Sequence, residues 1–328
     1  MPTVETVKGP VEVDDLGPTL MHEHVFILST EHTQNYGDGT WWDEEARVAD
    51  AVAKLTALRA KGITTIVDPT VWGLGRYVPR IQRIAAQVDL NIIVATGLYA
   101  YEELPQQYAY RGPGLLVDMP EPMVTDFTRD IVDGIGTTGV KAAFLKCCVE
   151  AQGLTTGVDR IVRAVARTHV ETGAPITVHT SGPARTGSLA LGVFRTEGVD
   201  LTKVVIGHAG DSNDLDYLME LADAGATLGM DRFGLDLFNP TADRVRTIAA
   251  LAARGYADRM VLAHDASCFI DYFGAGHDAV RAAAAPNWHF THISDDVIPA
   301  LREAGVDEAQ VRQMLVENPR RYFTGSPS

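Results

Sequence analysis

The sequence predicts an α/β fold: a single (β/α)8 barrel over residues 1–328, with its active site at the C-terminal ends of the strands. Three observations predict it. Short β-branched runs recur eight times, helix-like amphipathic segments separate them, and no linker rich in proline or serine divides the chain. Two smaller domains would also fit this length. A doubly wound open sheet is disfavoured in its dinucleotide-binding form, because no Gly-x-Gly-x-x-Gly follows the first strand.

The predicted strands are short runs rich in valine, isoleucine and threonine. In chain order they are Thr19–Ile27, Thr64–Pro69, Asn91–Tyr99, Lys141–Val149, Pro175–Thr180, Lys203–Ala209, Ala226–Phe233 and Met260–Asp265. The clearest helix is Asp43–Lys61, because its apolar residues repeat at three- and four-residue spacing and Gly62 stands where a C-terminal cap belongs. The other predicted helices are Gly157–Val170, Ser212–Ala224, Ala242–Arg254 and Asp307–Val316.

The segment 266–292 interrupts this alternation, since no clear strand or long helix is predicted in it. Its aromatic residues are Phe269, Tyr272, Phe273, Trp288 and Phe290. Loops longer than about 15 residues are usually functional or disordered, and this one is too aromatic for disorder. We expect it to form a wall or lid of the substrate pocket for an apolar group. A cover of the barrel or a subunit contact is the alternative.

The composition narrows the classes of partner. A net charge of −15 and a pI near 5.0 disfavour nucleic acid and anionic membranes, and suit small molecules or metal cations. The three cysteines form no disulfide framework, which indicates a reducing compartment. The N-terminus has no apolar signal region and no stretch reaches membrane-span length. We therefore expect a cytoplasmic protein.

Two histidines open the first predicted strand. Side chains two residues apart share one face of a strand, so His22 and His24 are expected to point together and Glu23 the other way. Two imidazoles on one face can bind a metal ion. Two ordinary core histidines are the alternative for such a short motif.

Further polar residues stand at the ends of other predicted strands. They are Lys146, His179, His208 and Asp265. Because strand ends converge at the top of a barrel, four histidines and a carboxylate from four strands favour a metal centre over core histidines. A lysine ammonium has donors only, so it cannot ligate a metal. Lys146 is therefore a nearby cation, a strand-end lysine whose tip reaches solvent, or a chemically modified residue.

The remaining candidates receive minor roles. We expect most of the other histidines to face solvent: His32, His169, His277, His289 and His292. His264 adjoins Asp265 on the strand and is expected to point away from the site, in a packing or supporting role. One of Cys147 and Cys148 must face the barrel interior, and packing is expected for both, since no base is identifiable beside either thiol.

The site residues and the strings around them resemble the phosphotriesterase family of the amidohydrolase superfamily. The matching strings are Met-His-Glu-His, Phe-Leu-Lys, Val-His-Thr-Ser, Ile-Gly-His-Ala-Gly-Asp and Ala-His-Asp-Ala-Ser-Cys. They occur in the family's order and span nearly the whole chain. The resemblance implies a carboxylated Lys146 that bridges two divalent metals together with a hydroxide. It implies His22, His24 and Asp265 on the buried metal and His179 and His208 on the outer one.

Two residues resemble the lactonase branch of that family. They are Tyr99, where efficient organophosphate hydrolases carry tryptophan, and Arg232. The resemblance implies a homodimeric lactonase with weak phosphotriesterase activity, acting on N-acyl homoserine lactones and thereby quenching quorum signals. It implies that Asp265 moves the proton, that Tyr99 lies near the lactone ring and that Arg232 shapes the adjacent loop. A packed rim tyrosine and an arginine paired with Asp231 or Asp236 are the plain alternatives.

Several alternatives stay open for the chemistry. Imidazole, carboxylate and carbamate ligands suit zinc, which we expect, but also iron, cobalt or manganese. Phosphotriesters could be the main substrates. A mononuclear deaminase-like site is disfavoured by the lysine on the fourth strand. A metal-binding barrel that binds lactones without turnover belongs to another functional class, and a turnover assay distinguishes it.

Overall fold

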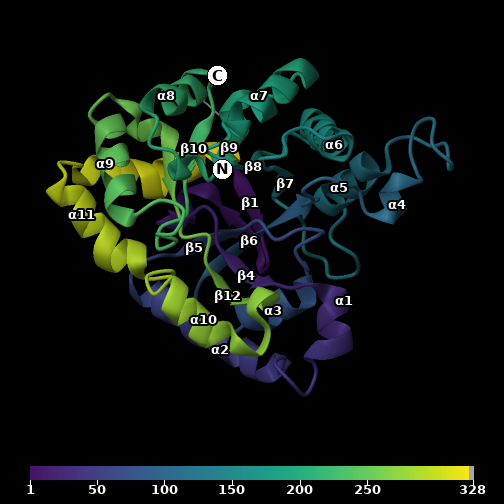
Figure 1. The fold of residues 1–328 in the computed structure, drawn as a ribbon, viewed down its shortest axis with the longest axis horizontal. Coiled ribbons are helices and arrows are strands. Elements are labelled where there is room, and N and C mark those ends of the chain that lie inside the picture. The colour runs from purple at the N-terminus through teal and green to yellow at the C-terminus, as the bar shows by residue number, and fades with distance from the viewer. Residues whose placement is uncertain (325–328) are drawn as a thin grey trace.

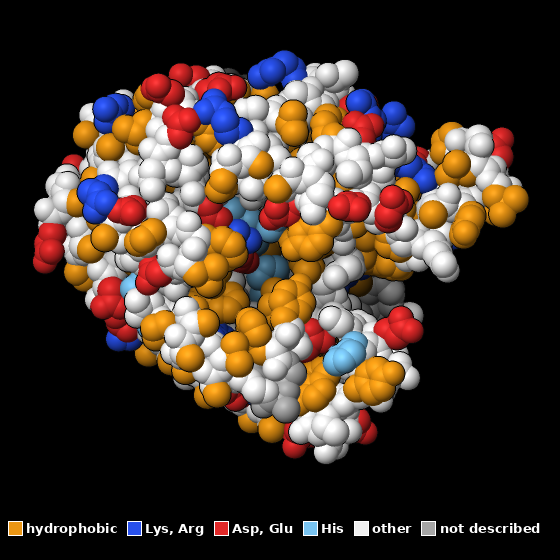
Figure 2. Space-filling model, viewed as in Figure 1, with side chains coloured by type: hydrophobic (Ala, Val, Ile, Leu, Met, Phe, Trp, Pro, Cys, Tyr) orange, Lys and Arg blue, Asp and Glu red, His pale blue; other side chains and the backbone are white. Residues whose placement is uncertain are grey.

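A computed structural model describes residues 1–324, except for the side chains at positions 274, 275 and 277. Eight parallel strands form one sheet, and each lies beside the next barrel strand along the chain. Its two edges meet through hydrogen bonds that include Met21 N–H to Leu262 O at 3.2 Å. The sheet is thus nearly closed into the predicted barrel, with helices around it (Figure 1). In the same view, the surface is hollowed near its centre (Figure 2).

Every predicted run contains one barrel strand, and each strand is shorter than its run. The strands are β3 (Thr19–Leu20), β5 (Thr65–Asp68), β6 (Asn91–Gly97), β7 (Phe144–Val149), β8 (Ile176–Thr180), β9 (Val204–Gly207), β10 (Thr227–Met230) and β11 (Met260–Leu262). The chain leaves extended conformation where two predicted runs end, since φ is +64° at His208 and +53° at Asp265. An antiparallel hairpin of β1 (Thr3–Thr6) and β2 (Gly9–Glu12) precedes the barrel.

Helices separate most of the strands. They are α1 (Thr30–His32), α2 (Glu44–Ala60), α3 (Val78–Ala85), α4 (Gln106–Ala109), α5 (Pro122–Val132), α6 (Thr156–Thr172), α7 (Thr186–Glu197), α8 (Leu215–Asp223), α9 (Thr241–Ala252), α10 (His277–Ala284), α11 (Ile298–Glu303), α12 (Glu308–Arg312) and α13 (Asn318–Thr324). The five predicted helices are confirmed as α2, α6, α8, α9 and α12. The Asp43 side chain caps α2 by accepting from Ala46 N–H at 3.0 Å. Within residues 1–324, no helix has both the length and the apolarity of a membrane span.

The first and last barrel regions differ from the prediction. The run Thr19–Ile27 is interrupted after β3, and its second half, β4 (His24–Ile27), leaves the barrel. There β4 pairs in parallel with β12 (Ser267–Ile270). The segment 266–292 therefore does contain a strand, and α10 lies in it as well. The prediction that this segment contains no clear strand was wrong, because four residues are too few for hydrophobic periodicity to identify a strand.

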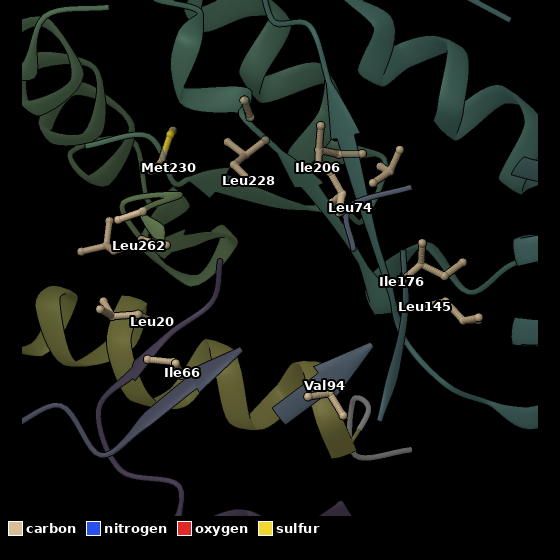
Figure 3. Packing of buried hydrophobic residues seen from close by; sticks show 14 of the residues in the cluster. Leu20, Ile66, Leu74, Val94, Leu145, Ile176, Ile206, Leu228, Met230 and Leu262 are labelled. Atoms are coloured by element: carbon tan, nitrogen blue, oxygen red, sulfur yellow. The ribbon is translucent and has the colours of Figure 1, made fainter. Parts of the chain in front are cut away.

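Two apolar layers position the site. The smaller cluster fills the barrel interior and includes Met21, Val67, Ile93, Phe144, Val205, Val261 and Tyr322. The larger one lies between strands and helices and includes Leu20, Ile66, Val94, Leu145, Ile206, Leu228 and Leu262 (Figure 3). Successive strand residues alternate between the two layers, as Phe144 and Leu145 do. The same alternation directs Lys146 and Cys148 inward and Cys147 outward.

Gly97 on β6 fixes the neighbouring backbone of Lys146. Its φ is +138°, and a Cβ atom there would lie 1.9 Å from Lys146 O. Gly97→Ala is expected to lower the free energy of unfolding by roughly 3 kcal/mol, measured by denaturant titration. Gly62→Ala is the matched control, because Gly62 also has positive φ (+92°) but open space around it. It should cost only about 1 kcal/mol. Equal losses in the two variants would contradict the predicted clash.

Candidate metal centre

The residues predicted to bind metal gather at the C-terminal end of the barrel. They are His22, His24, Lys146, His179, His208 and Asp265. The four histidines and the lysine are at most 4% exposed, and the Asp265 side chain is 13% exposed. Histidine side chains are visible at the bottom of the central hollow (Figure 2). A lysine tip that reaches solvent is excluded, because Lys146 is buried.

One group of ligand atoms surrounds an oxygen of Asp265. Asp265 Oδ1 lies 3.2 Å from His24 Nε2 and 3.4 Å from His22 Nε2. These three residues are close enough together to hold one cation. Lys146 Nζ lies 3.3 Å from His22 Nε2, on the edge of this group. His22 and His24 thus share one side of the chain, as their spacing predicts, although His22 precedes the strand.

A second group lies beside the first. His208 Nε2 is 2.8 Å from His179 Nδ1, and it is 3.8 Å from the other oxygen of Asp265, Oδ2. Asp265 therefore reaches both groups with one oxygen each. Two clusters of imidazole nitrogens joined by a carboxylate form a donor set that suits two divalent cations.

Buried partners orient the histidine rings. Asp231 accepts from His22 Nδ1 through Oδ2 and from His208 Nδ1 through Oδ1, both at 2.9 Å. Because a carboxylate only accepts, both Nδ1 atoms carry the proton, and both Nε2 lone pairs face the site. His22, His208 and Asp231 could also surround a cation themselves. Each of the two rings forms one hydrogen bond of ordinary length with its own oxygen of Asp231. These distances favour a role for Asp231 in orienting the rings over a role as a metal ligand. His24 Nδ1 is held by Thr70 Oγ1 at 2.7 Å.

His179 has a partner at the rim. Glu150, just beyond β7, lies 2.8 Å from His179 Nε2 through Oε1. The hydrogen bond with His179 is the main cause that lowers the pKa of Glu150 to about 2. An ionised Glu150 keeps the proton on Nε2 and leaves Nδ1 facing His208. Tyr99 Oη is 3.5 Å from both nitrogens of that ring.

Burial sets the protonation of the site. It lowers the pKa of His22 and lowers that of His179 to about 4, so both rings are neutral at neutral pH. It also lowers the pKa of Lys146, against the opposing charges of Asp265 and Asp231. Burial would raise the pKa of Asp265, but its cationic and hydrogen-bonding neighbours, among them Arg232, hold it well below its usual range. The centre therefore combines neutral nitrogen donors with an ionised carboxylate.

Arg232 joins the site to the rim. Its Nε donates to Asp265 Oδ2 at 3.0 Å, and its Nη1 donates to Asp211 Oδ2 at 2.8 Å. The alternative pairing with Asp231 or Asp236 was wrong. Asp231 is occupied by the two histidines, and Asp236 accepts from the Thr241 backbone and hydroxyl.

A cavity of about 300 Å³ opens above these groups. Apart from the metal-site residues it is lined by Ile27, Leu74, Tyr99, Tyr101, Arg232, Leu235, Leu237, Phe238, Ile270, Tyr272, Phe273 and Trp288. Three of the five aromatic residues of segment 266–292 are in this wall. The other two are not: Phe269 packs against Trp41 and Trp42, and Phe290 lines a separate cavity behind Trp288. Most of the wall is apolar, with polar groups only at its base and rim.

The remaining histidines divide between surface and interior. His32 is exposed as predicted, and the side chain of His277 lies outside the described residues. The prediction was wrong for His169 and His292, which are buried. His169 Nδ1 donates to Ala174 O, and His292 Nδ1 contacts Asp296. Both lie at helix ends, where the sequence alone does not show that a neighbouring segment covers the ring.

Some supporting residues were missed in the sequence. Glu150, Asp211 and Thr70 resemble ordinary polar residues at strand ends, and a single sequence carries no signal that separates them. Glu23 was placed correctly on the side away from the metal site. It is completely buried, and it accepts hydrogen bonds from His264 and Ala266. Burial raises the pKa of Glu23, while these N–H donors act in the opposite direction.

Comparison with known sequences identifies relatives over the whole length. A profile of the phosphotriesterase family matches residues 2–323. The chain is 54% identical over 323 residues to the phosphotriesterase homology protein of Mycobacterium tuberculosis, with 98% of each chain covered. It is 36% identical over 317 residues to the aryldialkylphosphatase of Saccharolobus solfataricus, with 97% of this chain and 98% of the relative covered.

Solved structures of similar proteins also match over nearly the whole chain. The phosphotriesterase from Mycobacterium tuberculosis superposes with a TM-score of 0.95 at 54% identity and 98% coverage of both chains. A structure from the engineering of organophosphate hydrolysis on a weak promiscuous lactonase template superposes with a TM-score of 0.89 at 32% identity. That match covers 98% of this chain and 99% of the other.

Proposed function

This chain belongs to the phosphotriesterase family, and from that premise we propose that it is a dinuclear metal-dependent enzyme that opens lactones. The relatives support hydrolysis of ester bonds in general. N-acyl homoserine lactones are the proposed substrates, because they combine a hydrolysable ring with an apolar chain. The observation that carries the proposal is that Asp265 reaches both histidine pairs beneath a largely apolar cavity.

The donor set fits two divalent cations. His22, His24 and Asp265 would hold the first ion, and His179 and His208 the second. An ammonium beside two cations would be repelled, so we propose that the Lys146 amine adds carbon dioxide and loses a proton, giving an anionic carbamate. Its buried position favours the neutral amine that this addition needs. Zinc is the proposed metal, with iron, cobalt and manganese compatible with the same ligands.

The chain's own residues would direct the reaction. When bound, the cations would polarise the substrate carbonyl and acidify a water molecule. Asp265 would accept the proton of that water and return it to the leaving alkoxide. Arg232 donates to Asp265 and so supports the ionised, accepting form at the start of the reaction. Ring opening would give a hydroxy acid.

Tyr99 and the cavity wall would orient the substrate. Burial raises the pKa of Tyr99, so its hydroxyl remains a donor at neutral pH. It lies over His179 and would donate to the ring oxygen of the lactone. The wall of the cavity would hold the acyl chain through Leu235, Leu237, Phe238, Ile270, Tyr272 and Phe273.

Phosphotriester hydrolysis is the second candidate activity. It is favoured by the similarity to an aryldialkylphosphatase and to a lactonase template used for organophosphate hydrolysis. The same polarised site and the same proton acceptor could serve attack at phosphorus. We propose it as the weaker activity, because Tyr99 resembles the lactonase pattern.

Parallel kinetics would test the assignment. The enzyme loaded with zinc is assayed on a long-chain N-acyl homoserine lactone and on an aryl phosphotriester. We expect kcat/KM for the lactone to be higher by about three decades, or roughly 4 kcal/mol in transition-state stabilisation. A higher value for the triester would overturn the substrate assignment and leave the metal centre in place. Absence of turnover with two bound metals would overturn both substrate assignments.

Tyr99→Trp is expected to separate the two activities. The larger ring removes the hydroxyl donor and narrows the cavity, so kcat/KM for the lactone should fall about 30-fold, near 2 kcal/mol. Triester hydrolysis, which does not need that donor, should change less than about threefold, or under 1 kcal/mol. Tyr99→Phe serves as the control for the hydroxyl alone. Equal losses for both substrates would remove Tyr99 from the specificity argument.

A further inference from the structure

Asp265 adopts an unusual backbone conformation. Within residues 1–324, the non-glycine residues with positive φ are Arg185, His208 and Asp265. This region is unfavourable for residues with a Cβ atom, so it persists only where the surroundings enforce it. The chain turns at Asp265 between β11 and β12, and this turn carries the carboxylate that joins the two histidine groups.

The Glu23 carboxylate accepts hydrogen bonds from both residues that flank Asp265. Its Oε1 accepts from the His264 backbone N–H at 2.7 Å and from His264 Nδ1–H at 2.6 Å. Its Oε2 accepts from the Ala266 backbone N–H at 3.1 Å. Glu23 is 0% exposed, so water does not compete for these bonds. One carboxylate therefore spans the turn from the residue before Asp265 to the residue after it.

The hydrogen bonds of His264 establish the direction of this contact. Its Nε2 accepts from the Ile293 backbone N–H at 2.9 Å, so the ring proton is on Nδ1 and is donated to Glu23. Trp288 Nε1 donates to the carbonyl oxygens of His264 and Asp265, at 3.0 and 3.1 Å. His264 thus faces away from the metal site and links Glu23 to the turn.

A related arrangement occurs at the other strained residue of the site, where the carboxylate contacts that residue itself. His208 also has positive φ, and Asp231 accepts from its backbone N–H at 2.8 Å and from its Nδ1 at 2.9 Å. In both places a buried carboxylate holds the backbone and the Nδ1 of one histidine. Asp231 touches the metal-site rings directly, whereas Glu23 touches only the turn around Asp265.

We propose that Glu23 is a positioning residue that enforces the backbone of Asp265 and thereby aims its carboxylate at both metal positions. The inference rests on the proposed dinuclear site. The neighbouring backbone supports it, because Asp265 N–H donates to His22 O at 3.0 Å and His24 N–H donates to Ala266 O at 2.7 Å. The segment 22–24 therefore supplies two histidines to the site and holds Asp265 with the residue between them.

Glu23→Gln tests the proposal in the cobalt-loaded holoenzyme. Glutamine keeps the size but replaces an acceptor oxygen by a donor, so an N–H of the turn loses its partner. We expect metal release into a chelator to become about 10- to 100-fold faster, as is typical when the support of a metal ligand is removed. The visible absorption of bound cobalt should also shift, and kcat should fall while KM changes little.

Variants at His264 keep the test decisive should Glu23→Gln fold poorly. His264→Leu removes one of the three N–H donors to Glu23 and should shift metal release and the cobalt spectrum in the same direction as Glu23→Gln, by less. His264→Asn retains a donor near the position of Nδ1 and should stay closer to the wild type than His264→Leu in both readouts. Wild-type release, spectrum and kcat in both Glu23→Gln and His264→Leu would overturn the proposal.

The metal readouts distinguish this failure from failure of the proposed function. The metal release rate and the cobalt spectrum are measured without substrate. They therefore test the role of Glu23 whichever ester the enzyme hydrolyses. A wild-type protein that binds two metals but opens no lactone would overturn the substrate assignment alone. A wild-type protein that binds fewer than two metals would overturn the dinuclear site, and with it the role of Glu23.

Discussion

Replacing Lys146 with alanine is expected to abolish binding of the second metal and to lower kcat/KM by about four decades, or roughly 5 kcal/mol. Lys146 points into the barrel beside His22, 3.3 Å from its Nε2, where burial favours a neutral amine. The second histidine pair offers only two nitrogens, which is too few for a tight divalent site. Loss of the proposed carbamate would therefore remove a ligand from each of the two proposed metal positions.

The measurement is metal content per chain by elemental mass spectrometry, together with kcat/KM on the lactone. Lys146→Met is the matched variant, because it keeps length and apolar volume without the amine. Lys141→Ala is the control, since Lys141 precedes the same strand but is partly exposed. Reconstitution of the metal-free wild type without carbon dioxide should be slow and should recover on adding bicarbonate. Two metals and full activity in Lys146→Ala would refute the carbamate.

The barrel could be predicted because its evidence is local. Each strand is a short β-branched run, and the register of parallel neighbours places the run ends together. The interruption between β3 and β4 could not be predicted in this way. It depends on backbone bonds from Met21 to Leu262 and from His24 to Ala266, which join parts of the chain more than 200 residues apart. Sequence periodicity carries no information on such pairs.

The gathering of the candidate metal ligands could be predicted for a similar reason, and the residues that support them could not. Histidine, lysine and aspartate at strand ends are conspicuous, because the fold directs those ends to one place. Asp231 is recognisable only when His22, 209 positions away, is seen beside it. The partners of Arg232 could not be predicted from the sequence either. Its sequence neighbours suggested partners on its own loop, but its actual partners, Asp211 and Asp265, come from other strand ends.

Asp265→Asn is expected to lower kcat by about three decades, or roughly 4 kcal/mol, with little change in KM. Asparagine has nearly the same size, so the apolar wall that would bind the substrate stays in place. It lacks the charge that Arg232 and the two histidine groups face, and its amide cannot accept a proton from water at neutral pH. The change therefore acts on the chemical step and weakens the first metal position.

Asp236→Asn separates this effect from a general loss of rim charge. Asp236 lies on the loop that follows β10 and accepts from Thr241, so it contacts neither histidine group. We expect its kcat to stay within about threefold of wild type, under 1 kcal/mol. With both metals restored by excess zinc, Asp265→Asn should still be slow, because the missing proton acceptor is not replaced. Recovery to wild-type kcat under that condition would show that Asp265 only binds metal. The proton would then have to leave through another group at the rim, for which Glu150, ionised and hydrogen-bonded to His179, is a candidate.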